Sequence, residues 1–159
     1  METLIVQLSR YIIIVLFVMY TFYCFRAFAS KNKKRQNQVF RAQRILTLLL
    51  HLVCSSILML EYQSMKVLMM YGLEVAFYLV FIKLYETFYK GLSKLVLNNM
   101  LLCMLIGFIM LGRLSYNYAF RQFCMAACGM AVCLLVPMII HKLSGFLERL
   151  GWQYAIAGI

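Results

Sequence analysis

The feature that most constrains this chain is the recurrence of apolar runs close to the length of a membrane span. A helix needs about 20 mostly apolar residues to cross the hydrocarbon layer of a bilayer. The runs cover roughly residues 8–28, 45–60, 67–85, 95–111 and 122–140. Strict alternation of apolar and polar residues is absent, so an outer-membrane β-barrel is not expected. The sequence therefore predicts an all-α integral membrane protein with five complete transmembrane helices.

The positive charges predict how these helices are oriented. Lysine and arginine collect in cytoplasmic connections of membrane proteins. Alternate connections divide the basic residues into twelve on one side and four on the other. The larger set is Arg26, Lys31, Lys33, Lys34, Arg35, Arg41, Arg44, Lys83, Lys90, Lys94, Lys142 and Arg149, and the smaller set is Arg10, Lys66, Arg113 and Arg121. This count places the larger set in the cytoplasm and the N-terminus outside.

The net charge of +11 has the same explanation. In a soluble protein it would suggest a nucleic-acid partner. In a chain that is 65% hydrophobic, topology accounts for it, and no nucleic-acid partner is expected.

The last apolar run, residues 152–159, begins a sixth helix that the sequence does not complete. Eight residues cannot cross a bilayer, and an unfinished helix would leave backbone groups unpaired in lipid. We therefore expect the chain to be the front part of a longer multi-span protein.

The stretch from Leu111 to Phe123, LGRLSYNYAFRQF, is expected to form a short outer loop. Its arginines, Arg113 and Arg121, lie on the side where the charge rule disfavours them. A guanidinium can bind a phosphate through two parallel hydrogen bonds. Alternatively, both side chains anchor the helix ends at the lipid headgroups beside an aromatic belt. Gln122 is expected to hold the loop against the next helix.

The order of elements from residue 95 onward resembles the start of the SEDS family (shape, elongation, division and sporulation), which includes FtsW, RodA and SpoVE. The resemblance is carried by LLCMLIGFIMLGRL, SYNYAFRQF with its Arg-Gln pair, CMAACGMAVCLLVPMII, HKLSGFLERL and the Trp-led GWQYAIAGI. Residues 95–159 then correspond to the start of the family core. Residues 1–94 then form a three-helix membrane extension. With three added helices, the first core helix enters the membrane from the cytoplasm only if the N-terminus lies outside.

The resemblance implies a bacterial cytoplasmic-membrane protein that polymerises lipid II, the undecaprenyl-linked peptidoglycan precursor, during cell division or cell-shape maintenance. A class B penicillin-binding transpeptidase is the implied partner. The essential acidic residue of the family lies in a large outer loop beyond the third core helix. No catalytic residue is therefore expected in this chain, and the resemblance implies no cofactor.

Two ionisable residues interrupt the predicted spans and form a second candidate site. Glu74 lies near the middle of the third span and His51 lies in the second. An ionisable group at this depth is costly and marks a function by default. Glu74 is either protonated or in contact with His51, and the contact serves either to join helices or to relay a proton. The sequence offers no metal-ligand spacing among its histidines and six cysteines.

Two other classes of protein fit the same pattern of spans. One is a non-enzymatic membrane module, such as the sensor region of a signalling protein. The other is a lipid-handling or transport bundle, which paired intramembrane charges would favour. The Arg-Gln pair favours the SEDS-like interpretation.

Overall fold

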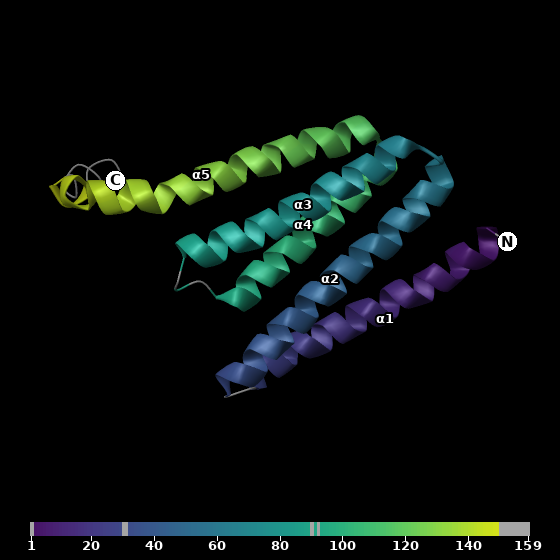
Figure 1. Ribbon diagram of the computed structural model, residues 1–159, viewed down its shortest axis with the longest axis horizontal. Coiled ribbons are helices and arrows are strands. Elements are labelled where there is room, and N and C mark those ends of the chain that lie inside the picture. Colours follow the sequence, from purple (N-terminus) through teal and green to yellow (C-terminus); the bar gives the residue numbers. More distant parts are fainter. Residues whose placement is uncertain (1, 30–31, 90, 92, 150–159) are drawn as a thin grey trace, which may run out of the picture. The chain divides into compact units, whose positions relative to one another are not determined.

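Every element that the structure, a computed structural model, describes is an α-helix (Figure 1). The description covers residues 2–29, 32–89, 91 and 93–149, with side chains between residues 7 and 136. The helices are α1 (Glu2–Ala29), α2 (Lys33–Tyr62), α3 (Met65–Phe88), α4 (Lys94–Leu114) and α5 (Tyr116–Arg149). Each contains a stretch that is long and apolar enough to span a membrane. This confirms the predicted all-α class and, by helix length and apolar composition, the five predicted spans.

The chain divides into two compact units, residues 1–123 and 124–159, and the division falls inside α5. The first unit contains α1 to α4 and the first two turns of α5. The division expected at residue 94 rests on the family resemblance, and it stays a prediction. The expected start of a sixth helix, residues 152–159, lies outside the described residues.

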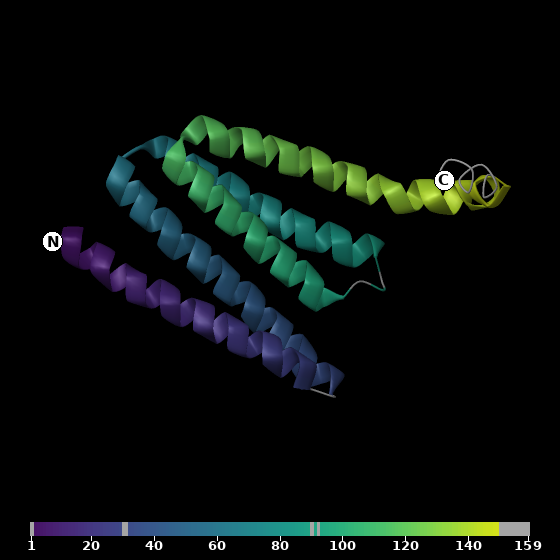
Figure 2. The ribbon, with the colours of Figure 1, turned by 180° about the vertical axis from the view of Figure 1, so that it is seen from behind.

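Within the first unit, α2 is the central helix. It packs against α1, α3 and α4, and α3 also packs against α4. From α1 to α4, consecutive helices run in opposite directions (Figures 1 and 2), so the ends of α1 and α3 lie with the beginnings of α2 and α4. We call this end the basic end, because it carries Arg26, Lys33, Lys34, Arg35, Arg41, Arg44 and Lys94. We call the other the opposite end, where α2 meets α3 and α4 meets α5.

The second helix is longer than expected. The apolar run predicted a start at Ile45, whereas α2 begins at Lys33. The N-cap residue Asn32 accepts a hydrogen bond from the Lys34 backbone N–H at 3.0 Å, which is the usual way to satisfy a free helix donor. Lysine, arginine and glutamine are also strong helix formers. Most of the basic stretch is therefore helix and not a loop.

The expected outer loop is also helical, and its prediction was wrong. Helix α4 continues to Leu114, and α5 begins at Tyr116. Only Ser115 separates them, in an extended conformation (φ −168°, ψ 138°), and its backbone N–H closes α4 on the Leu111 carbonyl at 2.9 Å. The fifth helix also continues beyond the apolar run of residues 122–140, to Arg149.

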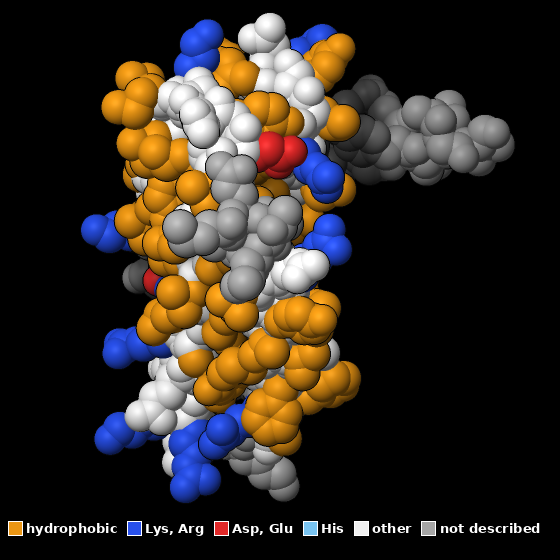
Figure 3. Space-filling model, turned by 90° about the vertical axis from the view of Figure 1, so that its right-hand side faces the viewer, with side chains coloured by type: hydrophobic (Ala, Val, Ile, Leu, Met, Phe, Trp, Pro, Cys, Tyr) orange, Lys and Arg blue, Asp and Glu red, His pale blue; other side chains and the backbone are white. Residues whose placement is uncertain are grey.

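The flank of the molecule suits lipid more than water. In Figure 3, hydrophobic side chains cover much of the visible surface, and several Lys and Arg side chains gather at the lower end. Large apolar residues such as Tyr11, Val18 and Phe22 are 62–70% exposed. Scattered exposed apolar residues are normal on a protein surface, but a continuous apolar flank is not. The fold thus supports a multi-pass membrane protein in contact with the bilayer.

Candidate functional site

The structure brings the two ionisable residues of the predicted spans together. The His51 Nε2 and the Glu74 Oε2 lie 2.7 Å apart, joining α2 to α3. The two side chains are 0% and 6% exposed. A hydrogen bond of this length is stronger in a low-dielectric environment than in water. The pair is therefore the most deeply buried ionisable contact that the structure describes.

The remaining contacts fix the imidazole in place. The ring of Tyr71 stacks on the His51 ring, with centroids 5.0 Å apart and planes inclined by 23°. The second ring nitrogen, Nδ1, is buried and has no hydrogen-bond partner among the described residues. A buried polar atom without a partner costs free energy. Glu74 therefore makes the one hydrogen bond that the His51 ring has among the described residues.

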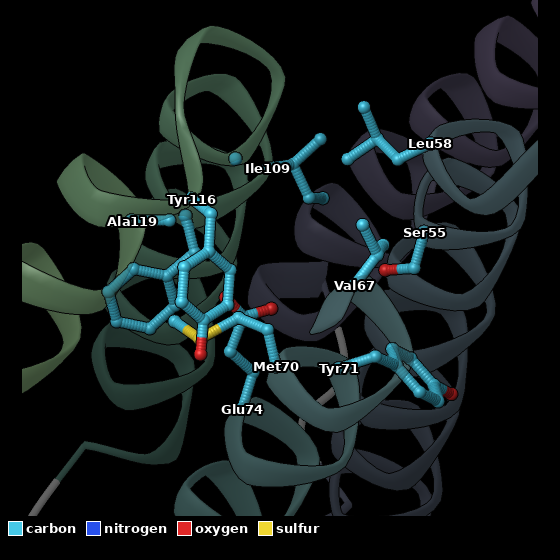
Figure 4. A pocket seen from close by; sticks show the side chains of 11 residues that line it. Ser55, Leu58, Val67, Met70, Tyr71, Glu74, Ile109, Tyr116 and Ala119 are labelled. Atoms are coloured by element: carbon cyan, nitrogen blue, oxygen red, sulfur yellow. The ribbon is translucent and has the colours of Figure 1, made fainter. Parts of the chain in front are cut away.

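Glu74 also lines a small cavity (Figure 4). Its volume is about 40 Å³, which exceeds the 10–15 Å³ or so that one water molecule needs. The lining residues that carry polar groups are Ser55 on α2, Tyr71 and Glu74 on α3, and Tyr116 at the start of α5, all within the first unit. Apolar residues complete the wall, including Met70, Phe108 and Ile109. Glu74 thus contacts His51 and also lines a water-sized space.

This arrangement can perform two tasks. It can hold α2 and α3 in one register, because among the described residues neither side chain has another hydrogen-bond partner. It can also hold a proton that exchanges with a water molecule in the cavity. The cavity is too small for a lipid or a sugar, so the arrangement is not a binding site for the precursor.

The residues of the predicted phosphate site lie at the opposite end of the first unit. Arg113 in the last turn of α4 and Arg121 in the second turn of α5 are both exposed. Neither side chain makes a hydrogen bond or ion pair with the residues that the structure describes. The Tyr62 hydroxyl donates to the Arg113 backbone carbonyl at 2.6 Å, which ties the end of α2 to the end of α4. Gln122 is partly buried.

Aromatic side chains surround this end, as the sequence suggested. Tyr116 and Phe120 stack one turn apart, with centroids at 6.3 Å, and the Lys66 ammonium lies 6.0 Å from the Tyr116 ring. Both arginines are therefore free to contact an anion outside the protein, and aromatic anchors flank them.

Sequence reasoning missed a network of polar side chains near the basic end. Asn98 of α4 is 1% exposed, and its amide donates to the Gln43 Oε1 at 3.0 Å and to the Phe40 carbonyl at 3.3 Å. Its own oxygen accepts from the Arg44 Nε at 3.1 Å. Arg44 also forms an ion pair with Glu86 of α3 at 2.6 Å. The buried amide of Asn98 therefore joins α4 to α2, and Arg44 extends the network to α3.

The network extends to α1 through the neighbouring residue, Asn99. Its oxygen accepts from the Tyr20 hydroxyl at 2.7 Å and from the Cys24 thiol at 3.5 Å, and the Gln43 amide donates to Cys24 at 3.2 Å. The available signal was the paired amide Asn98-Asn99 near the start of an apolar run. Such residues in a membrane helix usually hydrogen-bond across helices.

The part of the chain that the structure describes contains no group of three His, Cys, Asp or Glu side chains placed to hold a metal ion. All six cysteines are free thiols, and Cys103, Cys124, Cys128 and Cys133 are exposed. The exposed thiols lie on apolar helices, where lipid would contact them.

Comparison with protein families, with characterised proteins and with solved structures gives no match to this chain. The fold and the site define a polytopic helical membrane protein with a buried His–Glu pair.

Proposed function

We propose that this chain is the N-terminal membrane portion of a SEDS-like peptidoglycan glycosyltransferase in a bacterial cytoplasmic membrane. The observation that carries the proposal is the order of motifs from residue 95 onward, with an Arg-Gln pair beside a short break between two apolar helices. The proposed N-terminus is extracytoplasmic, which puts the opposite end on the side where lipid II is polymerised.

The environment of the arginines supports a role toward the precursor. Arg113 and Arg121 lie at the same end of the first unit, are exposed, and make no ion pair with described residues. Lipid II carries a pyrophosphate, and a guanidinium binds phosphate oxygens through two parallel hydrogen bonds. In this proposal the arginines hold the pyrophosphate near the membrane surface, and Gln122 steadies the start of α5. The catalytic acid belongs to a part of the protein outside this chain.

The His51–Glu74 pair has a structural role in this proposal. Both side chains are almost fully buried, and the adjoining cavity has room only for water. The pair then keeps α2 and α3 in register beneath the outer surface. In this proposal the three helices of the extension support α4 and α5 in the membrane. The class B penicillin-binding partner would associate with α4 and α5.

The test is lipid II polymerisation by membranes that contain the natural full-length protein. Membranes from cells overproducing it, incubated with fluorescent lipid II, are expected to form glycan strands, and membranes from depleted cells to form fewer. Arg113→Lys and Arg121→Lys are expected to lower polymerisation about tenfold or more, since lysine keeps the charge but loses bidentate geometry. Arg10→Lys is the matched control, because Arg10 is also exposed and on the same predicted side.

Two outcomes would count against the proposal. Polymerisation that does not change with the amount of protein would remove the enzymatic assignment and favour a sensor or transport bundle. Full activity in both arginine variants would leave them as headgroup anchors.

A further inference from the structure

A polar cleft opens at the basic end, on the other side of the unit from the arginines proposed to contact lipid II. It lies where α2, α3 and α4 meet and has a volume of about 210 Å³. Its lining residues are Asn37, Phe40, Arg41, Arg44, Glu86 and Lys94. Three cations face one carboxylate, so the cleft carries a net charge of +2 (three minus one). A cleft of this charge and size suits an anion such as a phosphate group.

The guanidinium of Arg44 is fixed in the wall of the cleft. Its Nη2 lies 2.6 Å from the Glu86 Oε1, and its Nε donates to the buried Asn98 Oδ1 at 3.1 Å. An arginine has five N–H donors, and these contacts engage two of them. Three donors thus remain for a ligand, on a side chain whose position the protein has already set. Glu86 does not compete for the site, because Arg44 already neutralises it.

Arg41 and Lys94 supply positive charge that forms no ion pair with the described residues. Arg41 lies one turn before Arg44 on the same face of α2, and it makes no ion pair or hydrogen bond with the described residues. The Lys94 ammonium donates to the Asn37 Oδ1 at 3.2 Å and keeps two further donors. The two cations therefore frame the cleft from α2 and from α4.

The surroundings of the cleft identify the source of the phosphate. The large side chains of Ile45, next to Arg44, and of Val96, two residues after Lys94, are 58% and 62% exposed. The apolar flank of the unit begins here, at the level where the charged end stops. A phosphate in the cleft would thus sit at the boundary that a lipid headgroup occupies, with its acyl chains along the flank. A free phosphate has no acyl chains and would gain no binding energy from the apolar flank.

We propose that the cleft formed by Arg41, Arg44 and Lys94 binds the phosphate of an anionic phospholipid headgroup. Basic pockets between transmembrane helices are a known way to bind such headgroups. The proposal is independent of lipid II polymerisation, because it concerns other residues at the other end of the molecule.

Native mass spectrometry of the full chain in detergent tests the proposal. Phosphatidylglycerol is expected to bind one molecule per chain, and phosphatidylcholine, whose headgroup has no net charge, at least tenfold more weakly. Arg41→Gln and Lys94→Gln are each expected to weaken phosphatidylglycerol binding about fivefold, the effect of one basic residue near an anionic surface. Lys34→Gln is the matched control: it removes one charge from an exposed position of α2 outside the cleft, and binding should not change.

Three results would overturn the proposal, each in a different way. Equal losses in the Lys34→Gln variant would reduce the effect to general surface charge and overturn the site. Displacement of the lipid by inorganic phosphate at millimolar concentration would show a free-phosphate site and overturn the lipid assignment. Arg41 is exposed, so its substitution should leave the helix content measured by circular dichroism unchanged. Unchanged binding in a folded Arg41→Gln variant would therefore refute the proposal.

Discussion

The contact between His51 and Glu74 gives a prediction whose size follows from the geometry. Replacing Glu74 by leucine removes the partner of the His51 Nε2 and leaves both ring nitrogens buried and unsatisfied. Replacing His51 by leucine leaves a buried carboxyl group without its partner. Replacing both exchanges the pair for two apolar side chains of similar size. The double variant should therefore cost much less than the sum of the single ones.

The magnitude is set by two limits. Removing one partner of a buried ion pair in a soluble protein costs about 3–5 kcal/mol. Polar contacts between membrane helices contribute less, about 0.6 kcal/mol on average and up to about 1.7, because the unfolded chain in the membrane finds other partners. The side chains are only 0% and 6% exposed. We thus expect each single variant to cost about 2 kcal/mol, the double variant no more than about 2, and the coupling to be about 2.

The assay is unfolding of the purified full chain by sodium dodecyl sulfate in mixed micelles, followed by circular dichroism. Glu74→Gln keeps an amide that can bond to the imidazole and should cost under about 1 kcal/mol. Glu61→Leu is the matched control, since Glu61 is exposed at the end of α2 and its loss should cost at most about 0.5 kcal/mol. If the double variant costs the sum of the two single ones, the pair does not act as a unit and the structural role is refuted.

Three further predictions test the orientation, the amide network and a helix cap. With its own cysteines replaced by alanine, the chain carrying Met65→Cys should react with an impermeant thiol reagent on intact cells, and the chain carrying Gly91→Cys only in opened membranes; the reverse would place the N-terminus inside. Asn98→Leu should cost about 2–3 kcal/mol in the same unfolding assay, because Gln43 and Arg44 lose a buried partner, and a cost under about 0.5 would contradict this. Ser64→Ala should cost about 0.5–1 kcal/mol, because its hydroxyl accepts from the Lys66 N–H, whereas Ser93→Ala, which loses no such bond, should cost almost nothing; equal costs would contradict the cap.

The sequence predicted the number and class of the helices because apolar length is a direct physical requirement of a membrane span. The prediction of the helix ends was wrong for the same reason, because apolar length marks only the part of a helix that lies in the membrane. The apolar part of α2 begins at Ile45, but Lys33 to Arg44 are good helix formers and simply continue the helix outward. At Ser115, a change in one residue's backbone conformation is enough to end α4 and start α5. Hydropathy averaged over a window of many residues cannot detect a helix break of one residue.

The candidate site was predictable only in part. Glu74 and His51 stood out because each is ionisable in an apolar span, and similar depth in neighbouring helices suggested contact. The network around Asn98 depends on how α2 and α4 are aligned, and its partners lie 54–58 residues apart in the sequence. Sequence spacing carries no information about that alignment.

The two polar clusters explain why α2, which appeared to be the shortest span, organises the first unit. Its buried residues include Val39, Gln43, Leu50 and Leu58, spaced so that they recur on one face of the helix. Polar residues on that helix meet α4 through Gln43 and α3 through His51, at different levels. In lipid, apolar contacts alone give little driving force for helices to choose a partner. Two polar contacts at separate levels fix both the partner and the register, so the loss of either should loosen one helix pair and leave the other in place.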